Sequence, residues 1–176
     1  MDHHEYEQLT ALTAEAIGVP GQRRFRLAGG VEGDVVILWM EKEELRALGL
    51  AIEELLEQLG MAGLASHRLA SDPLQPAVPG PTSPEYAVGR MAIGYDEERK
   101  LIALFAHDIE QEEEEDELPI FAGRMTAANA KALAEQIVEV VNAGRPRCPR
   151  CGALIGPEGH VCPHDNGHLK VKLQGD

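Results

Sequence analysis

The sequence is poor in basic residues, in aromatic residues and in cysteine, and each shortage excludes a class of protein. Its 176 residues include 16 Lys and Arg against 30 Asp and Glu, a formal net charge of −14. Duplex DNA and anionic membranes attract clustered basic side chains, so this balance argues against general DNA binding and against membrane docking. One Trp, three Tyr and three Phe cannot fill a core of this size, so aliphatic side chains must build it.

Long apolar runs are also lacking. No uncharged apolar stretch reaches the roughly 18 residues that a transmembrane helix needs. The first residues, Met1–Glu5, are acidic, unlike the basic start and apolar run of a signal peptide. All three cysteines lie between residues 148 and 162, and an odd number without an export signal disfavours a disulfide framework. We therefore predict a cytoplasmic protein.

The negative charge is concentrated in one run. Eight of the ten residues from Asp108 to Glu117 are acidic and none is basic, which supplies −8 of the net charge of −14. Like charges repel one another in such a block, so we predict a solvated acidic loop over residues 108–117. A cation site is a sharper alternative, but calcium loops space their ligands around a glycine turn that this run lacks. A docking site for a basic partner is a third interpretation.

Prolines interrupt the middle of the chain. Five of them fall within residues 61–85. Proline removes a backbone donor and blocks helix continuation, so this stretch is predicted to be a linker. It separates residues 1–60 from residues 86–144, and residues 145–176 form a tail of different composition.

The segments on either side of the linker resemble each other. The tripeptide Ala-Ile-Gly occurs at residues 16–18 and, 76 residues later, at 92–94, and each copy precedes a turn and a second strand pattern. Further along, Met40 matches Met125 with an offset of 85. The acidic run accounts for the nine extra residues as an insertion between the second and third strands. We predict two βββα units, an internal repeat that arose by duplication.

Each unit ends in the pattern of an amphipathic helix, with apolar residues at steps of three and four. These residues are Leu45, Leu48, Ile52, Leu55 and Leu59 in the first unit and Ala130, Leu133, Ile137 and Val140 in the second. Thr126 is a suitable N-cap for the second helix. The predicted fold class is α+β, with about six strands in a largely antiparallel sheet and both helices on one face. A C-terminal zinc-ribbon or zinc-knuckle tail follows.

The tail contains a metal-binding pattern. Cys148 and Cys151 have the Cys-x-x-Cys spacing, which lets a tight turn bring both sulfurs to one ion about 2.3 Å away. The predicted ligands form a Cys3His set typical of structural zinc: Cys148, Cys151, His160 and Cys162. Other candidates for the fourth ligand are His164, His168 and, more remotely, Asp165.

A structural role suits this site better than a catalytic one. Residues 148–168 contain few apolar side chains, so metal binding must supply their folding energy. A catalytic zinc needs an open water position and a general base, and the pattern offers neither. A thioredoxin-like redox pair sits between a strand and a helix start, whereas this pair follows a predicted helix end. The predicted cofactor is therefore a structural Zn²⁺.

Four segments together identify a family. They are Gly-Val-Pro-Gly-Gln-Arg at 18–23, Met-Glu-Lys-Glu at 40–43, and the two stretches 144–152 and 157–167 that carry the cysteines. In these residues the chain resembles an uncharacterised bacterial family, domain of unknown function 3090. The resemblance covers nearly the whole chain and departs from the family at the proline-rich linker and the acidic run. It implies a cytoplasmic protein encoded beside a kinase-like and a histidine-phosphatase-like protein, and it implies no activity.

Three functions remain. We favour a non-catalytic adaptor whose partner is another protein, because no nucleophile elbow, phosphate loop or dinucleotide fingerprint occurs. An enzyme or small-anion-binding protein with a site between the two units is the alternative. Its anion ligands would be the basic residues after the matched turns, Arg23, Arg24, Arg99 and Lys100, which otherwise serve as solvated strand-edge charges.

Nucleic-acid contact through the tail is a second alternative. Residues 144–176 contain five basic and three acidic residues, a balance of +2, which is a thin patch beside an acidic body. The sequence makes no prediction of oligomeric state.

Overall fold

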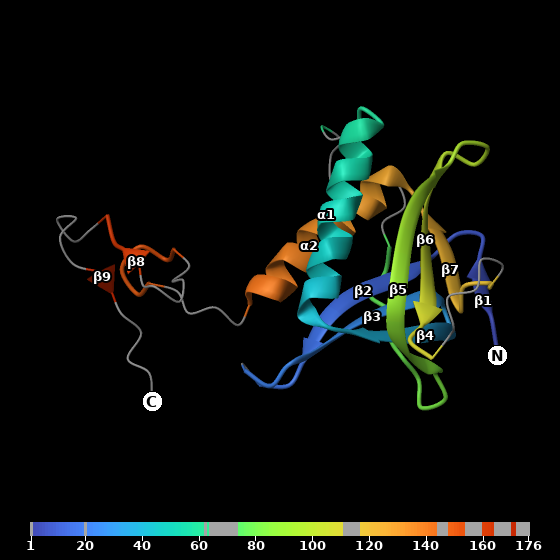
Figure 1. The fold of residues 1–176 in the computed structure, drawn as a ribbon, viewed down its shortest axis with the longest axis horizontal. Coiled ribbons are helices and arrows are strands. Elements are labelled where there is room, and N and C mark those ends of the chain that lie inside the picture. The colour runs from blue at the N-terminus through green and yellow to red at the C-terminus, as the bar shows by residue number, and fades with distance from the viewer. Residues whose placement is uncertain are drawn as a thin grey trace. The chain divides into compact units, whose positions relative to one another are not determined.

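In the computed structural model of the chain, four strands precede helix α1 and three more lie between α1 and helix α2 (Figure 1). In chain order the elements are β1 (His4–Tyr6), β2 (Ala11–Ile17), β3 (Arg24–Val31), β4 (Asp34–Met40), α1 (Lys42–Gln58), β5 (Glu85–Asp96), β6 (Leu101–Asp108), β7 (Phe121–Met125), α2 (Ala127–Asn142), β8 (His160–Val161) and β9 (Lys170–Val171). The structure describes residues 2–19, 21–61, 63, 74–110, 117–143, 148–153, 160–163 and 170–171. The chain divides into a body, Met1–Val141, and a tail, Asn142–Asp176.

The body is built on a seven-stranded sheet in the order β1-β7-β6-β5-β4-β3-β2. Neighbouring strands within β2–β3–β4 and within β5–β6–β7 run antiparallel, whereas β4–β5 and β1–β7 are parallel. The predicted α+β class with a largely antiparallel sheet is confirmed. The sheet has one strand more than predicted, because β1 is only three residues long and shows no apolar periodicity.

One continuous segment joins the two ends of this sheet. The N-terminal stretch pairs with β7 through β1 and with β3 through β2. Between these strands, the N–H of Leu9 donates to the Arg124 carbonyl at 2.8 Å and the N–H of Thr10 donates to the Gly30 carbonyl at 3.0 Å. The sheet therefore curls, and a Cβ added to Gly29 on β3 would lie 3.4 Å from Phe121 Cζ on β7.

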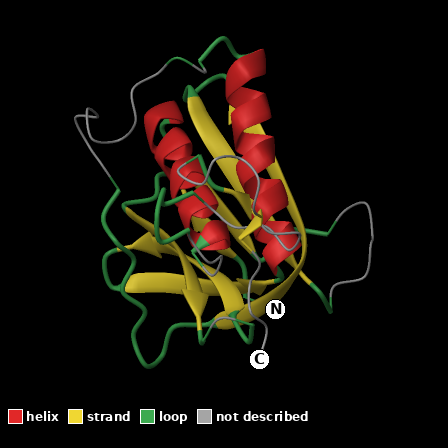
Figure 2. Cartoon of the chain, turned by 90° about the vertical axis from the view of Figure 1, so that its left-hand side faces the viewer, coloured by secondary structure: helices red, strands yellow, loops and turns green. Residues whose placement is uncertain are grey.

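Both helices cover the same, inner face of the curled sheet (Figure 2). The apolar stripes predicted from the sequence point into the core, with Leu45 and Ile52 of α1 fully buried and Leu133 and Ile137 of α2 nearly so. The end of the α1 stripe differs from the prediction, because Leu56 is buried while Leu55 is only partly covered. In the described part of the chain, neither helix is long and apolar enough to span a membrane.

Local hydrogen bonds cap the N-terminal ends of both helices. Thr126 caps α2, since its hydroxyl oxygen accepts a hydrogen bond from the N–H of Asn129 at 3.1 Å, as predicted. At the start of α1, Glu41 and Glu44 form a capping box in which the N–H of Glu41 donates to Glu44 Oε2 at 2.7 Å. These caps fix where each helix begins after its preceding strand.

Part of the proline-rich stretch 61–85 is attached to the body. The N–H of Gln75 donates to the Thr10 carbonyl at 3.0 Å, and the N–H of Leu12 donates to the Gln75 carbonyl at 3.1 Å. Ala77 is buried in a cluster with alanines and a valine of β2, β3 and β4. Residues 62 and 64–73 of the stretch lie outside the described part. The segment Leu74–Ala77, called the strap below, is therefore attached along β2 and is not a flexible linker.

Each half contains a hairpin, a further strand and a helix in that order, but the first half has the extra strand β1 and the hairpin registers differ. Ile17 is the last residue of β2 and pairs with Arg24, whereas Ile93 lies three residues before the end of β5 and pairs with Leu104. The Ala-Ile-Gly match with an offset of 76 therefore falls at different positions in the two hairpins. Met40 and Met125 do occupy matching places, as the last residues of β4 and β7. The duplication stays a prediction.

The acidic run begins at Asp108, the last residue of β6, and ends at Glu117, before β7 begins at Phe121. The change in offset from 76 to 85 between the two halves predicted an insertion at this place. Residues 111–116 of the run lie outside the described residues.

Candidate functional site

The tail holds its cysteines on a tight turn. The N–H of Cys148 donates to the Ala153 carbonyl at 2.8 Å, and the N–H of Gly152 donates to the Cys148 carbonyl at 2.9 Å. Gly152 has a φ of 73°, the left-handed conformation that glycine adopts without steric cost. The third cysteine, Cys162, follows strand β8, which pairs with β9.

The turn and the strand bring three sulfur atoms together. The Sγ atoms of Cys148, Cys151 and Cys162 all lie within 4.8 Å of one another. Ligands 2.3 Å from a tetrahedral zinc ion stand about 3.8 Å apart, so the cluster needs little adjustment to close around one ion. Cys148 and Cys162 are buried and Cys151 is partly exposed. Among the described residues, none of the three is disulfide-bonded.

Hydrogen bonds give the thiols of Cys148 and Cys151 different acidities. The backbone N–H groups of Cys151 and Arg150 donate to the Cys148 sulfur and lower the pKa of that thiol to about 7, although burial opposes the shift. At Cys151 the N–H of Ala153 favours the thiolate, but burial and the thiols of Cys148 and Cys162 outweigh it and raise the pKa. One negative charge in the cluster disfavours the next, and a bound cation would remove that conflict.

The fourth predicted ligand is not tested. His160 begins β8, two residues before Cys162, but its side chain lies outside the described part of the chain. The alternatives His164, Asp165 and His168 also lie outside it. The structure thus brings the three predicted cysteines together, and the complete Cys3His set stays a prediction.

The four basic residues considered for an anion site do not meet. Arg23 precedes β3 at the β2–β3 turn, whereas Arg99 and Lys100 lie in the β5–β6 turn, at the opposite end of the body (Figure 1). Arg24 stacks on Trp39, with its Cζ 4.1 Å from the ring centroid, and Arg99 pairs with Asp96 at 3.1 Å. Strand pairing carries the two turns apart, so these residues act as separate surface charges.

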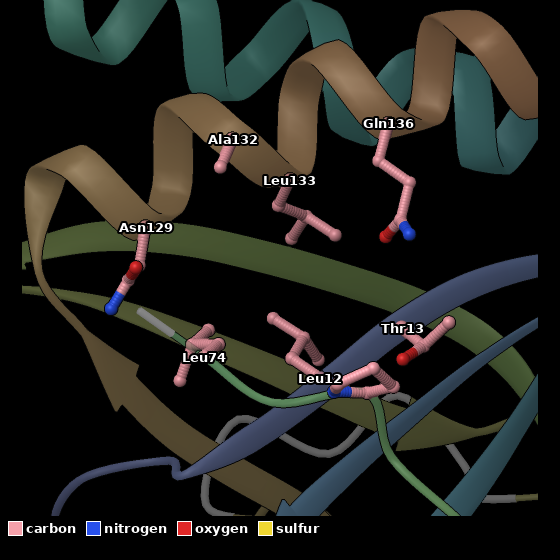
Figure 3. A pocket seen from close by; sticks show the side chains of 8 residues that line it. Leu12, Thr13, Leu74, Asn129, Ala132, Leu133 and Gln136 are labelled. Atoms are coloured by element: carbon pink, nitrogen blue, oxygen red, sulfur yellow. The ribbon is translucent and has the colours of Figure 1, made fainter. Parts of the chain in front are cut away.

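A second candidate site was not predicted from the sequence. A cavity of about 250 Å³ lies between α2, β2 and the strap Leu74–Ala77 (Figure 3). Leu12 and Thr13 line it from β2, and Asn129, Leu133 and Gln136 line it from α2. The only trace of it in the sequence is the seven-residue spacing of Asn129 and Gln136, which places both carboxamides on one helix face.

Neither a search among curated proteins nor a search among solved structures found a match to the chain. A match to a protein family does exist, and it extends from β1 to the last of the three cysteines. Over residues 4–162, the chain matches the family described as "Protein of unknown function (DUF3090)", and it belongs to that family.

Proposed function

We propose that this protein is a non-catalytic zinc-binding protein that serves in the cytoplasm as an adaptor, a module that binds another protein. The observation that carries the zinc assignment is the clustering of three sulfurs within 4.8 Å. The ligands are Cys148, Cys151 and Cys162, with His160 as the fourth. Zinc suits this set because it is borderline soft and takes thiolate and imidazole ligands in a tetrahedral arrangement.

The proposed zinc is structural. Three cysteines and one histidine fill all four positions of a tetrahedral ion, so no position remains for a reacting water. In the tail, the buried cluster among the described residues consists of the cysteines themselves. A cluster of this size supplies little hydrophobic stabilisation, so we propose that the tail depends on the metal for its fold.

Metal analysis tests this proposal. Protein purified under reducing conditions without added metal should contain about one zinc per chain by mass spectrometry. Cys148→Ser, Cys151→Ser and Cys162→Ser should each lose most of it. His160→Ala should lower the zinc content, while the matched variants His164→Ala and His168→Ala should keep it. A Cys151→Ser protein with full zinc content would contradict the assignment. Loss of zinc from His164→Ala but not from His160→Ala would identify His164 as the fourth ligand instead.

Charge supports the adaptor role. The body has 11 basic and 27 acidic residues, a net charge of −16, while the tail has five basic and three acidic residues, a net charge of +2. Such an asymmetry favours a partner with a basic surface facing the body. Crosslinked affinity capture of the full chain, at low and at high salt, should return one recurrent basic partner that high salt releases. Repeated capture without any such partner would count against the role.

We further propose that the body arose from two βββα units, with β1 as an additional strand before the first. Met40 at the end of β4 and Met125 at the end of β7 support this, since each lies directly before a helix cap, at Glu41 and Thr126. A ligand site between the two units, the alternative function, is favoured by one observation: the cavity between β2 and α2.

A further inference from the structure

The cavity in the body is bounded by three elements that are distant in the sequence. Leu12 and Thr13 come from β2, Leu74 and Pro76 from the strap, and the remaining lining from α2 (Figure 3). At about 250 Å³ it lies just below the roughly 300–1,000 Å³ of most ligand pockets. It therefore suits a molecule of one ring rather than a dinucleotide or a peptide.

The lining is apolar with a few polar groups, as ligand pockets usually are. None of the described side chains that line it is charged. A phosphate or carboxylate placed here would lose its hydration without gaining a counter-charge, which is unfavourable. The acidic body would repel an anion further. The lining therefore selects a neutral ligand.

Two carboxamides stand at opposite ends of the cavity. Asn129 and Gln136 are separated by seven residues, about two helical turns or roughly 10 Å along α2. In Figure 3 they flank the leucine side chains, with Leu133 and Leu12 between them. The arrangement is polar, apolar, polar along one helix face. Asn129 is only 3% exposed, so this end of the cavity is deeply buried.

Hydrogen bonds orient the polar groups at the Gln136 end. Gln136 Oε1 accepts the N–H of Ala14 at 3.0 Å, which fixes the amide orientation and turns its NH2 group into the donor available to a ligand. Thr13 Oγ1 accepts the N–H of Ala77 at 2.8 Å, which leaves its hydroxyl hydrogen to donate. This end therefore offers two donors and calls for an acceptor such as a carbonyl oxygen.

From this geometry we propose that the cavity binds a small uncharged molecule with an apolar ring and a carboxamide or lactam group. Its carbonyl oxygen accepts hydrogen bonds from Gln136 Nε2 and from the Thr13 hydroxyl. Its ring lies against Leu12 and Leu133. The site is separate from the zinc proposal, since no cysteine takes part in it.

Nicotinamide and benzamide serve as neutral probes, and nicotinate serves as the charged isostere of nicotinamide. Each is titrated into the full chain while amide NMR shifts are followed, above all those of the Ala14 N–H and the Gln136 NH2 group. At least one neutral probe should shift these signals saturably. Nicotinate should bind at least about tenfold more weakly than nicotinamide, because it brings an uncompensated charge.

Two variants separate binding from folding. Gln136→Glu keeps an acceptor for the Ala14 N–H but removes the donor group, and Ala132→Leu fills the cavity. Both should weaken binding about tenfold or more. Glu135→Gln, a change on the exposed side of α2, should leave binding unchanged. The proposal is overturned if no neutral probe binds at up to about 10 mM, the limit of meaningful affinity. It is equally overturned if nicotinate matches nicotinamide or if Gln136→Glu binds as the wild type does.

Discussion

Leu9 fills the space that a side chain on Gly123 would need. A Cβ added to Gly123 on β7 would lie 2.8 Å from Leu9 Cδ2 and 2.9 Å from two further Leu9 carbons. Leu9 is only 2% exposed, so its side chain is packed in the core. The contact lies where the N-terminal segment passes from β7 to β3, so it secures the joint that closes the sheet.

The first prediction follows from this contact. Gly123→Ala should lower the free energy of unfolding by about 1–3 kcal/mol, the usual cost of overpacking a core. Gly94→Ala on β5 is the matched control, because nothing lies within 4 Å of a Cβ there. The control should be neutral or stabilising by up to about 1 kcal/mol.

Urea denaturation of Gly123→Ala, of Leu9→Ala and of the double variant Gly123→Ala/Leu9→Ala, with Gly94→Ala as the control, measures the contact. The double variant should be less destabilised than the sum of its single changes, since truncating Leu9 makes room for the new methyl group. A Gly123→Ala protein as stable as Gly94→Ala would show that Leu9 does not restrict this position.

Removing the metal should unfold the tail and spare the body. In the presence of a zinc chelator, hydrogen exchange in the turn Cys148–Ala153 should accelerate strongly if the proposed zinc supplies the folding energy of the tail. Exchange in β6 and α2 should not change, since their core is formed by leucines, isoleucines and other apolar side chains of the body. Cys148→Ser without chelator should reproduce the result. Protection of the turn that survives the chelator would contradict the dependence on metal.

The ion pairs of Asp96 should make the body sensitive to acid. The backbone N–H of Arg99 and the guanidinium groups of Arg99 and Arg124 lower the pKa of Asp96 below its usual 3.8, against the effect of burial. A pKa that is lower in the folded state means a contribution to stability that is present above pH 3.8 and lost as the pH falls through the folded-state value.

The variant Asp96→Asn tests whether the stabilisation by Asp96 is lost as the pH falls. The difference in unfolding free energy between wild type and Asp96→Asn should be constant near neutral pH and should shrink below about pH 4. Glu97→Gln, an exposed neighbour, should show no comparable trend. A difference that grows as the pH falls would contradict the assigned direction.

The environment of Trp39, the one tryptophan of the chain, should be readable by fluorescence. Arg24 covers its ring at 4.1 Å, and its Nε1–H donates to Glu85 Oε2 at 2.8 Å. Arg24→Ala should shift the emission to longer wavelength, because water replaces the guanidinium, and should cost about 0.5–1 kcal/mol. Arg46→Ala on α1, where Arg46 pairs with Glu43, is the control. Equal spectra for both variants would rule out the stacking contact in solution.

Local chemistry determined what could be predicted from the sequence. The leucine and isoleucine spacing predicted both helices, because the burial of one helix face depends on positions three and four residues apart. Thr126 predicted the N-cap of α2, because a threonine hydroxyl at this position accepts a hydrogen bond from a backbone N–H three residues later. The cysteine spacing predicted the sulfur cluster, since Cys148 and Cys151 are joined by a turn and Cys162 is near in sequence.

Tertiary structure alone decided the features that join distant segments. Leu9 meets Gly123, the strap meets β2, and Gln136 meets Ala14 over 122 residues of sequence. No local pattern specifies such pairs, because they depend on strand register and on the curl of the whole sheet. Strand register also places the two Ala-Ile-Gly tripeptides at different positions in their hairpins, and strand pairing places Arg23 and Arg99 in separate turns. The clustered cysteines could therefore be predicted from the sequence, whereas the uncharged cavity exists only once β2, the strap and α2 have come together.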